Sequence, residues 1–474
     1  MSCLIQGAAT NAERRLLGKV LILKSSLTSR LVCALNALLF FALLPCACFA
    51  QATTAGSSPE GTLLRPFVGQ ERLLMVNGDE QFTFSENNHT QSLLRSYGSG
   101  NLPVVPTDEG VNLSNIELYI HKDADGSALL GYGPLPGTAP KQASWGYNTQ
   151  TVVGRASGSL FGGWDMGWGI NHRSATNHNT TASSLIVPNA YAAAYVPVLG
   201  GLNFFGGFMG AGIGHEVHSN LRLGPNQFAT HTYSSIAHPD LLLGGLVAGS
   251  FFRNQRGTLA WEFGINSGIE TVSSPNGTPA FQAAVRYRAP DFKTQIDYGT
   301  FWGNGEIRTG RNVANYPGTA WHGVISPRHQ RYQYHCLTLA RDFSQRWSAF
   351  TEFTLGHQSG DGRPDTVALR SGLGGFRGAS WGNAATGVTY RAKSKLWYNA
   401  RYEHFRDAAG FELPPGVRTD YNGFTGGVRY CIGRYMVLRP ELRYDWQDAA
   451  HGAAFNSNRS RSQLTGTTDL SVYF

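Results

Sequence analysis

Charged residues and cysteines are both scarce in this 474-residue sequence. Charged side chains make up 15% of the chain, whereas they form about a quarter of a typical soluble protein. Of the six cysteines, only Cys336 and Cys431 lie beyond residue 50. A secreted fold built on disulfides is therefore excluded, and one disulfide between these two residues is possible but not implied.

Signatures of catalysis and of helices are also missing. Beyond residue 50 helical signals are few, and there is no Gly-x-Ser-x-Gly elbow and no phosphate loop with Gly-Lys-Ser/Thr. The run 215–218 (His-Glu-Val-His) lacks the spacing of a zinc-binding His-Glu-x-x-His helix. We interpret the scattered loop histidines as solvated side chains: His172, His178, His231 and His238. We predict no catalytic residues, cofactor or metal, although spacing would not reveal the Ser/His pair of a membrane-embedded hydrolase.

Residues 1–50 have the composition of an export signal. Five basic residues between Arg14 and Arg30 precede an apolar run over 31–49, and small residues allow cleavage after Ala50 or Ala52. We predict a signal peptide over 1–50; the alternatives are a retained membrane anchor and a lipoprotein acylated at Cys46 or Cys48. The net charge of +8 and the pI of 9.2 partly reflect this leader. They do not indicate nucleic-acid binding, and we predict no nucleic-acid partner.

Glycine and aromatic residues are abundant, and they fall in alternating patterns. The chain has 58 glycines and 12% aromatic residues. Over 434–446, one set of alternate residues ends in four charges, and the other set is apolar and ends in two aromatics. Successive side chains of a strand point to opposite faces, so this pattern predicts a strand with one wet and one apolar face. A soluble β-sandwich would show the same alternation.

The carboxyl end favours a membrane barrel. The run 464–474 is apolar at most alternate positions and ends on Phe474. This pattern resembles the assembly signal of bacterial outer-membrane barrels. We therefore predict that Phe474 is an assembly signal recognised by the barrel-assembly machinery.

Short turns and long connections alternate four times in the second half of the chain. Tight turns at 289–291, 342–344, 393–394 and 432–433 join predicted strands, and the connections 303–330, 359–379, 407–420 and 447–462 are long and polar. This order predicts an all-β fold, a transmembrane antiparallel β-barrel of about 16 strands (roughly 14–18) with short periplasmic turns and long outer loops. The barrel domain spans 112–474. The segment 51–111 is predicted to be partly ordered, and its strand-like piece 72–84 is suited to a first strand or a periplasmic extension.

The apolar faces of these strands force alternate charged residues to the inside of the barrel. A charge facing lipid costs roughly 2–4 kcal/mol near the bilayer midplane. The predicted pore-lining residues are Glu117, Glu262, Arg286, Arg288, Lys293, Asp297, Glu352, Arg401, Glu403, Arg429, Arg439, Glu441, Arg443 and Asp445. Those from 401 to 443 come from three consecutive strands and form either a structural salt-bridge ladder or a solute-sensing patch, whose arginine excess predicts weak anion preference. Aromatic residues near strand ends fit interfacial girdles: Tyr298, Trp302, Trp347, Tyr398, Tyr444 and Trp446.

Short motifs over 188–252 carry a family resemblance. They include Asn189-Ala190-Tyr191, the run 195–198 (Tyr-Val-Pro-Val) and the glycine-rich run 206–214; 117–120 (Glu-Leu-Tyr-Ile) precedes them and 439–446 (Arg-Pro-Glu-Leu-Arg-Tyr-Asp-Trp) follows. With these motifs, residues 112–474 resemble the OmpL-like family of β-barrel porins. The resemblance implies a barrel in outer-membrane lipid of a bacterial cell that passes small hydrophilic solutes, and it implies no catalytic residues.

These patterns together predict a porin, a passive diffusion channel with a weak preference for anions. Two alternatives belong to other classes: an outer-membrane barrel enzyme of protease or lipase type, and a plugged barrel with an adhesion or structural role. Conductance in a planar bilayer separates the channel from both. The sequence gives no indication of the oligomeric state.

Overall fold

The computed structural model describes residues 75–87, 110–122, 124, 132–134, 136–154, 170–171, 184–216, 227–236, 238–239, 241–269, 278–303, 331–359, 378–408, 419–433, 436–448, 453–455 and 460–473. The chain divides into two compact units, Met1–Gln51 and Ala52–Phe474, and every described residue belongs to the second. The residues of the predicted signal peptide and Phe474 lie outside the described residues.

Strands account for nearly all the regular structure that is described. They are β1 (Met75–Asn87), β2 (Gly110–Lys122), β3 (Ser144–Gly154), β4 (Ile170–Asn171), β5 (Ser184–Val196), β6 (Leu202–Gly210), β7 (Leu241–Asn254), β8 (Gly257–Ile269), β9 (Ala280–Arg288), β10 (Thr294–Gly303), β11 (Tyr332–Asp342), β12 (Trp347–Ser359), β13 (Gly378–Lys393), β14 (Leu396–Asp407), β15 (Thr419–Ile432), β16 (Met436–Asp448) and β17 (Ser462–Tyr473). The described residues also include one 3₁₀ turn, η2 (Tyr233–Ile236). No helix in this part of the chain is long and apolar enough to cross a membrane.

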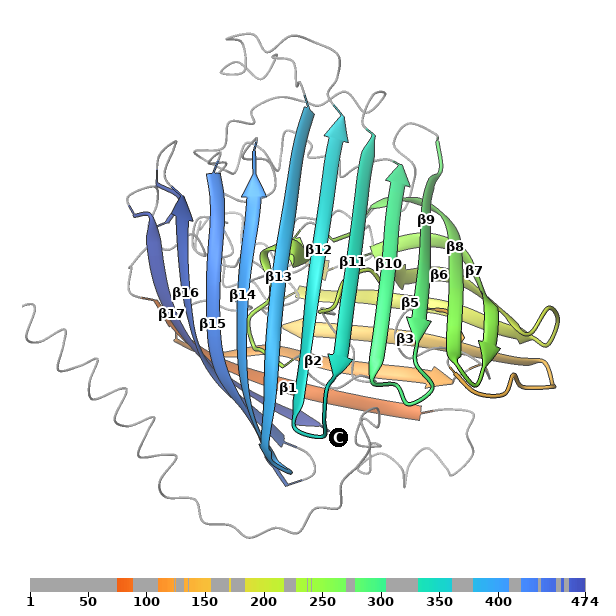
Figure 1. Cartoon of the computed structure of the whole chain (residues 1–474), viewed down its shortest axis with the longest axis horizontal. Helices are drawn as coiled ribbons and strands as arrows, with labels where there is room; N and C mark the ends of the chain where they lie inside the picture. The colour runs from red at the N-terminus through yellow and green to blue at the C-terminus, as the bar shows by residue number, and fades with distance from the viewer. Residues whose placement is uncertain are drawn as a thin grey trace, which may run out of the picture. The chain divides into compact units, whose positions relative to one another are not determined.

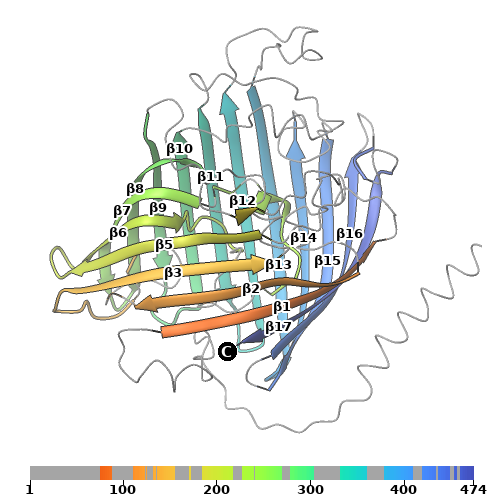
Figure 2. The same ribbon diagram turned by 180° about the vertical axis from the view of Figure 1, so that it is seen from behind.

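The strand pairings return to the strand from which they start. All pairs are antiparallel, and β1 pairs with both β2 and β17. Among the described residues the two-residue β4 pairs with β5 alone, so the described ring consists of the sixteen strands β1–β3 and β5–β17. Figures 1 and 2 show this ring from opposite sides, with the orange-red β1 beside the blue β17 in both views. The predicted all-β antiparallel fold and its strand number are confirmed.

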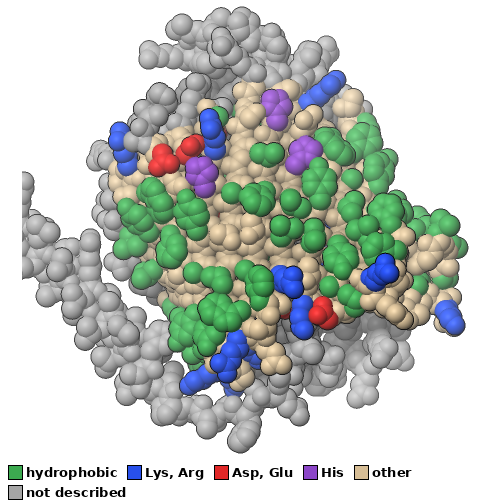
Figure 3. Space-filling view, in the orientation of Figure 1, with side chains coloured by type: hydrophobic (Ala, Val, Ile, Leu, Met, Phe, Trp, Pro, Cys, Tyr) green, Lys and Arg blue, Asp and Glu red, His purple; other side chains and the backbone are tan. Residues whose placement is uncertain are grey.

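The two faces of the sheet differ in polarity as the alternation predicts. Large apolar side chains such as Phe353 (47% exposed), Leu355 (66%) and Leu442 (62%) cover the outward face. The alternate residues on the same strands, such as Glu352 and Arg443, are buried. Figure 3 shows hydrophobic side chains spread over the outward face, with most of its charged side chains near the upper and lower margins. This polarity is the inverse of that of a soluble sheet with a dry core and is typical of a wall that faces lipid.

Turns and connections in the second half lie at the predicted positions. At most five residues separate β9 from β10, β11 from β12, β13 from β14 and β15 from β16, whereas the connections after β10, β12, β14 and β16 are longer. The turn predicted over 289–291 is longer than expected: Phe292 has φ 58° and still belongs to it, and β10 begins at Thr294. Cys336 and Cys431 are both free thiols.

The first half departs further from the predicted pattern. The strand-like piece 72–84 overlaps β1, which pairs with β2 over residues 75–85 and with β17 over residues 79–87. The strand β3 was not predicted, because its sequence mixes polar, aromatic and glycine residues without a clear alternation. Tyr132 lies in a bend before β3.

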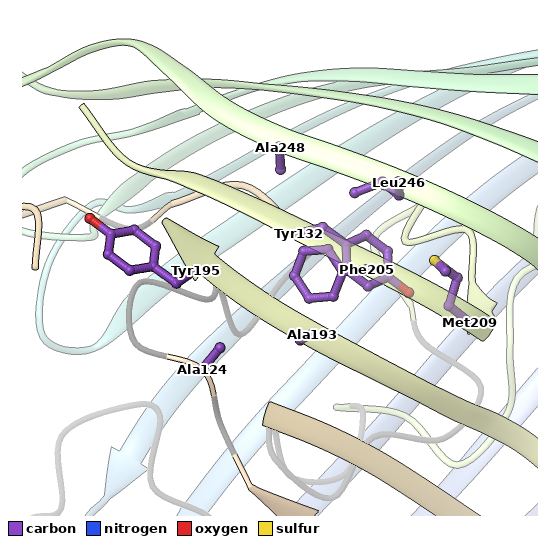
Figure 4. Close-up of a cluster of buried hydrophobic side chains, with 8 residues drawn as sticks. All are labelled: Ala124, Tyr132, Ala193, Tyr195, Phe205, Met209, Leu246 and Ala248. Carbon is purple, nitrogen blue, oxygen red and sulfur yellow. The ribbon is translucent and has the colours of Figure 1, made fainter. Parts of the chain in front are cut away.

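That bend belongs to the connection between β2 and β3, and Tyr132 contacts the inner face of the ring. Figure 4 shows Tyr132 among apolar side chains of β5, β6 and β7; the cluster comprises Ala124, Tyr132, Ala193, Tyr195, Phe205, Met209, Leu246 and Ala248. The Tyr132 and Phe205 ring centroids lie 4.8 Å apart, and the Tyr132 hydroxyl donates to the Gly210 carbonyl at 2.6 Å. This part of the inner wall is therefore covered by an apolar contact.

Candidate functional site

The described part of the connection between β6 and β7 lies against the inner face of the opposite wall. Its described residues, 211–216, 227–236 and 238–239, are called the inner segment below. Figures 1 and 2 both show η2, which belongs to this segment, beside β12–β14 within the ring. The side chains of Phe228, Thr230 and Ser234 are at most 3% exposed, so the segment is packed against the wall.

Two wall carboxylates accept hydrogen bonds from backbone N–H groups of the inner segment. Glu441 of β16 accepts from Ala229 at 2.8 Å and from Thr230 at 2.9 Å, one bond to each oxygen. Glu403 of β14 accepts from the Tyr233 N–H at 2.5 Å. Hydrogen bonds to a charged acceptor are roughly twice as strong as neutral ones, so these carboxylates fix the path of the segment.

Glu352 of β12 makes a third anchor. Its Oε2 accepts from the His215 backbone N–H at 2.6 Å, and its Oε1 accepts from the Ser234 hydroxyl at 2.6 Å. Within the segment, Glu216 accepts from the Thr232 N–H at 2.8 Å. The beginning and the end of the segment are thus tied to the same wall carboxylate.

Wall arginines satisfy the carbonyl groups of the same backbone. The bonds are from Arg439 to Phe228 (2.9 Å), from Arg401 to Thr230 (3.0 Å) and His231 (3.1 Å), and from Arg443 to His231 (2.9 Å). A buried backbone without regular secondary structure needs partners for its polar groups. Here the wall supplies donors and acceptors in alternation.

The same arginines are also paired with carboxylates. Arg443 lies 2.6 Å from Glu403 and 2.8 Å from Asp445, Arg439 lies 2.6 Å from Asp469, and Arg401 is bonded to Glu216. In the neighbouring wall Arg286 lies 2.8 Å from Glu262 and 3.3 Å from Asp297, which also binds Arg288. The charge of this patch is therefore largely compensated, and the predicted arginine excess overlooked Glu216 and Asp469.

Two titratable groups of the inner segment have shifted pKa values. Burial acts to raise the pKa of Glu216, but Arg401, the His231 imidazole 3.6 Å away and the hydrogen bond from the Thr232 N–H outweigh it and hold that pKa well below its usual value. Burial lowers the pKa of His215, whose ring stacks on Phe350 with the centroids 3.9 Å apart. Glu216 is therefore a carboxylate and His215 a neutral imidazole near neutral pH.

The structure brings most of the predicted wall residues to the inner face. Buried there are Glu262, Arg286, Arg288, Glu352, Arg401, Glu403, Arg439, Glu441, Arg443 and Asp445. Asp297 is partly buried between Arg286 and Arg288. Arg429 is half-buried over the Trp397 ring at 5.3 Å. Glu117 belongs to β2, and its side chain lies outside the described residues.

Three sequence interpretations are wrong. Lys293 does not line the wall: it lies in the turn before β10, 57% exposed and 3.5 Å from Asp291, because side-chain alternation does not extend into a turn. His231 and His238 are not solvated, at 6% and 4% exposure, because the connection that carries them folds inward. His172, His178 and His218 lie outside the described residues.

The aromatic residues of the predicted girdles are on the outward face. The most exposed are Trp347 and Tyr398, each at 48%, and Tyr444 at 44%. Missed by the sequence reasoning were Tyr132 and Tyr233, which contact the wall from the two connections. The Tyr132 N–H donates to Glu262 at 2.6 Å and the Tyr233 hydroxyl donates to Asp445 at 2.6 Å; a lone tyrosine in a polar connection gives no signal of either contact.

Known proteins place these observations in a family context. The sequence model of the family described as beta-barrel porin-2, OmpL-like, matches residues 81–474. No curated protein matches the chain significantly. Similar solved structures include the outer membrane channel DcaP of Acinetobacter baumannii (9% identity, 85% of this chain and 97% of that one, TM-score 0.48), Salmonella typhi OmpF in complex with daunomycin (9%, 85% and 97%, 0.47) and the outer membrane protein OmpT of Vibrio cholerae (9%, 86% and 99%, 0.47). These likenesses are too distant to carry an argument about the site.

Proposed function

The chain belongs to the beta-barrel porin-2, OmpL-like family and is an outer-membrane porin, and we propose that the inner segment forms the narrowest part of its channel. The observation that carries this proposal is the set of bonds by which Glu352, Glu403 and Glu441 hold the backbone of the segment against the wall. A segment held along its backbone keeps a fixed position in the lumen. Small hydrophilic solutes then pass between it and the rest of the ring.

We also infer that the channel prefers anions weakly, and that Arg391 and Arg429 contribute to this preference. The guanidinium groups of Arg391 and Arg429 lie 5.5 and 5.3 Å from the Trp397 ring, which is paired in register with both residues. Two cations on one stretch of a low-dielectric wall attract counter-ions. The arginines that hold the inner segment are paired with carboxylates, which offset their charge.

Planar-bilayer recordings with a salt gradient test both parts of this proposal. The parent protein should form channels whose reversal potential indicates anion preference, and replacing Arg391 and Arg429 by glutamine should shift it toward cations. The shift should shrink at about 1 M salt, where the Debye length is roughly 3 Å. A matched control replaces Lys293 and Arg256, both exposed in turns, by glutamine. Equal reversal potentials for the two double variants at low salt would remove the residue assignment, and absence of channels would remove the diffusion function.

We propose that the protein is not an enzyme. A serine hydrolase needs its hydroxyl bonded to the imidazole that acts as base. In the inner segment the Ser234 hydroxyl instead donates to Glu352 at 2.6 Å, and the imidazole of His238 faces that same carboxylate. This arrangement supports a structural use of the three side chains.

Delivery and assembly are further parts of the proposal. We propose that residues 1–50 are a cleaved export signal and that Phe474 is recognised by the barrel-assembly machinery. Supporting this, β17 joins β16 to β1 and thereby closes the ring of described strands. A signal on the strand that closes the ring would stay accessible to the barrel-assembly machinery until the ring has closed.

A further inference from the structure

Three side chains able to ligate a metal ion meet where the inner segment touches β11 and β12. Cys336, Glu352 and His238 offer ligand atoms that all lie within 4.8 Å of one another. All three residues are at most 4% exposed. Thr338 is the register partner of Glu352, and Cys336 lies two residues before it, so Cys336 and Glu352 are diagonal neighbours on the inner face. Such neighbours are within reach of a shared partner.

The imidazole of His238 is aimed into this cluster. Its Nε2 lies 3.7 Å from Glu352 Oε1 and, among the described residues, has no hydrogen-bond partner. The ring is held by the Tyr334 ring, at a centroid distance of 5.6 Å and 72°. The His238 ring also fills the space beside Gly214, so that a Cβ added to Gly214 would collide with the ring. A buried polar atom without a partner requires an explanation, and a bound cation would supply one.

We propose that Cys336, His238 and Glu352 form a binding site for a divalent metal ion of the zinc class. A thiolate, an imidazole and a carboxylate are all zinc ligands, whereas calcium and magnesium prefer oxygen ligands alone. Cys336 binds as the thiolate, and its proton leaves to solvent. With bond lengths of about 2.0–2.3 Å, tetrahedral ligand atoms lie roughly 3.5 Å apart. The triad therefore closes by about an ångström on binding, and a water molecule takes the fourth position.

The groups around the triad are placed to orient its carboxylate. The Ser234 hydroxyl donates to Glu352 Oε1 and the His215 backbone N–H donates to Oε2, both at 2.6 Å. Hydrogen bonds of this kind orient metal ligands and tune their affinity. Since His238 belongs to the inner segment and the other two ligands to the wall, the ion would join the segment to β11 and β12. The site does not depend on the proposed constriction, because its occupancy is measured without any channel recording.

Metal binding by the folded protein in detergent tests the site. After incubation with Zn²⁺ and exchange into metal-free buffer, the parent protein should retain one zinc per chain. With Co²⁺ it should show a sulfur-to-cobalt charge-transfer band. Cys336→Ser and His238→Gln should each weaken zinc binding by more than about 100-fold, which exceeds the usual effect of changing a group outside the ligand set.

Matched controls share the residue types but not the site. Cys431→Ser changes the other free thiol among the described residues. His335→Gln changes the residue before Cys336, whose ring is hydrogen-bonded to the Tyr298 hydroxyl on the outward face. Both should bind zinc like the parent. If a ligand variant does not fold, zinc X-ray absorption on the parent decides: a sulfur neighbour at about 2.3 Å supports the site. A shell of nitrogen and oxygen alone, or zinc retained fully by folded Cys336→Ser, would overturn the proposal.

Discussion

Replacing Glu441 by glutamine is expected to loosen the inner segment. The two carboxylate oxygens accept the N–H groups of Ala229 and Thr230 at 2.8 and 2.9 Å, and the side chain is 6% exposed. Glutamine has nearly the same shape but only one acceptor oxygen, so its NH₂ group would face one of the two backbone N–H groups. One buried amide would then lack an acceptor.

The expected size of the effect follows from these bonds. A hydrogen bond to a charged group contributes about 1.5–3 kcal/mol, and a buried donor left unsatisfied costs about 1–3 kcal/mol. We take about 3 kcal/mol as the loss for the docked segment relative to the undocked one. At a factor of ten for each 1.4 kcal/mol, the undocked population rises about 150-fold. The strand ring itself is little affected, because Glu441 makes these bonds to the segment rather than to a neighbouring strand.

Single-channel recording measures this change directly. Glu441→Gln should show frequent transitions to a higher conductance that are rare in the parent, since an undocked segment widens the path. Asp291→Asn, which removes an exposed carboxylate in a turn, should behave like the parent. A folded Glu441→Gln protein with the parent's conductance levels and transition frequency would refute the role of these two bonds.

Three further predictions concern pH, packing and assembly. Burial lowers the pKa of His215 below 6.5, and neighbouring carboxylates partly oppose this shift. Below that pH the undocked segment binds more protons than the docked one, so docking weakens and high-conductance transitions should increase from about pH 7.5 to about pH 5.5. Recordings of His215→Phe should show a flatter pH dependence. A Cβ on Gly356 would collide with the Trp381 ring, so Gly356→Ala should lower the free energy of unfolding in urea by about 1–3 kcal/mol, whereas Gly206→Ala, which meets nothing within 4 Å, should not. Removing Phe474 should reduce the outer-membrane yield far more than a substitution within 360–377, and equal yields would contradict a terminal assembly signal.

Local sequence patterns predicted most of the fold. The hairpins of the second half are each specified by alternation and a tight turn within about 25 residues, so their positions are readable without knowledge of the rest of the chain. Alternation failed where it was extended past the end of a strand, as at Lys293, which lies in a turn. It also missed β3, where a mixed composition hides the two faces.

The candidate site depends on contacts that no local pattern contains. Glu441 and the N–H of Ala229 are 212 positions apart in the sequence, and Glu403 and Tyr233 are 170 apart. The wall glutamates were predictable as inward-facing, because charge is excluded from the lipid face. Their partners were not, because a polar connection has the same composition whether it folds inward or outward. For the same reason His231 and His238 were taken for solvated side chains.

The arrangement of charge on the inner wall is explained by the backbone that it holds. Glu441 faces two N–H groups and Arg439 the carbonyl that precedes them, at Phe228. Arg401 and Arg443 then take the carbonyls of the next residues, Thr230 and His231. A patch selected only to attract anions would need no carboxylate at each N–H group. Mixed charge here therefore follows from the polarity of the peptide bond that these side chains hold.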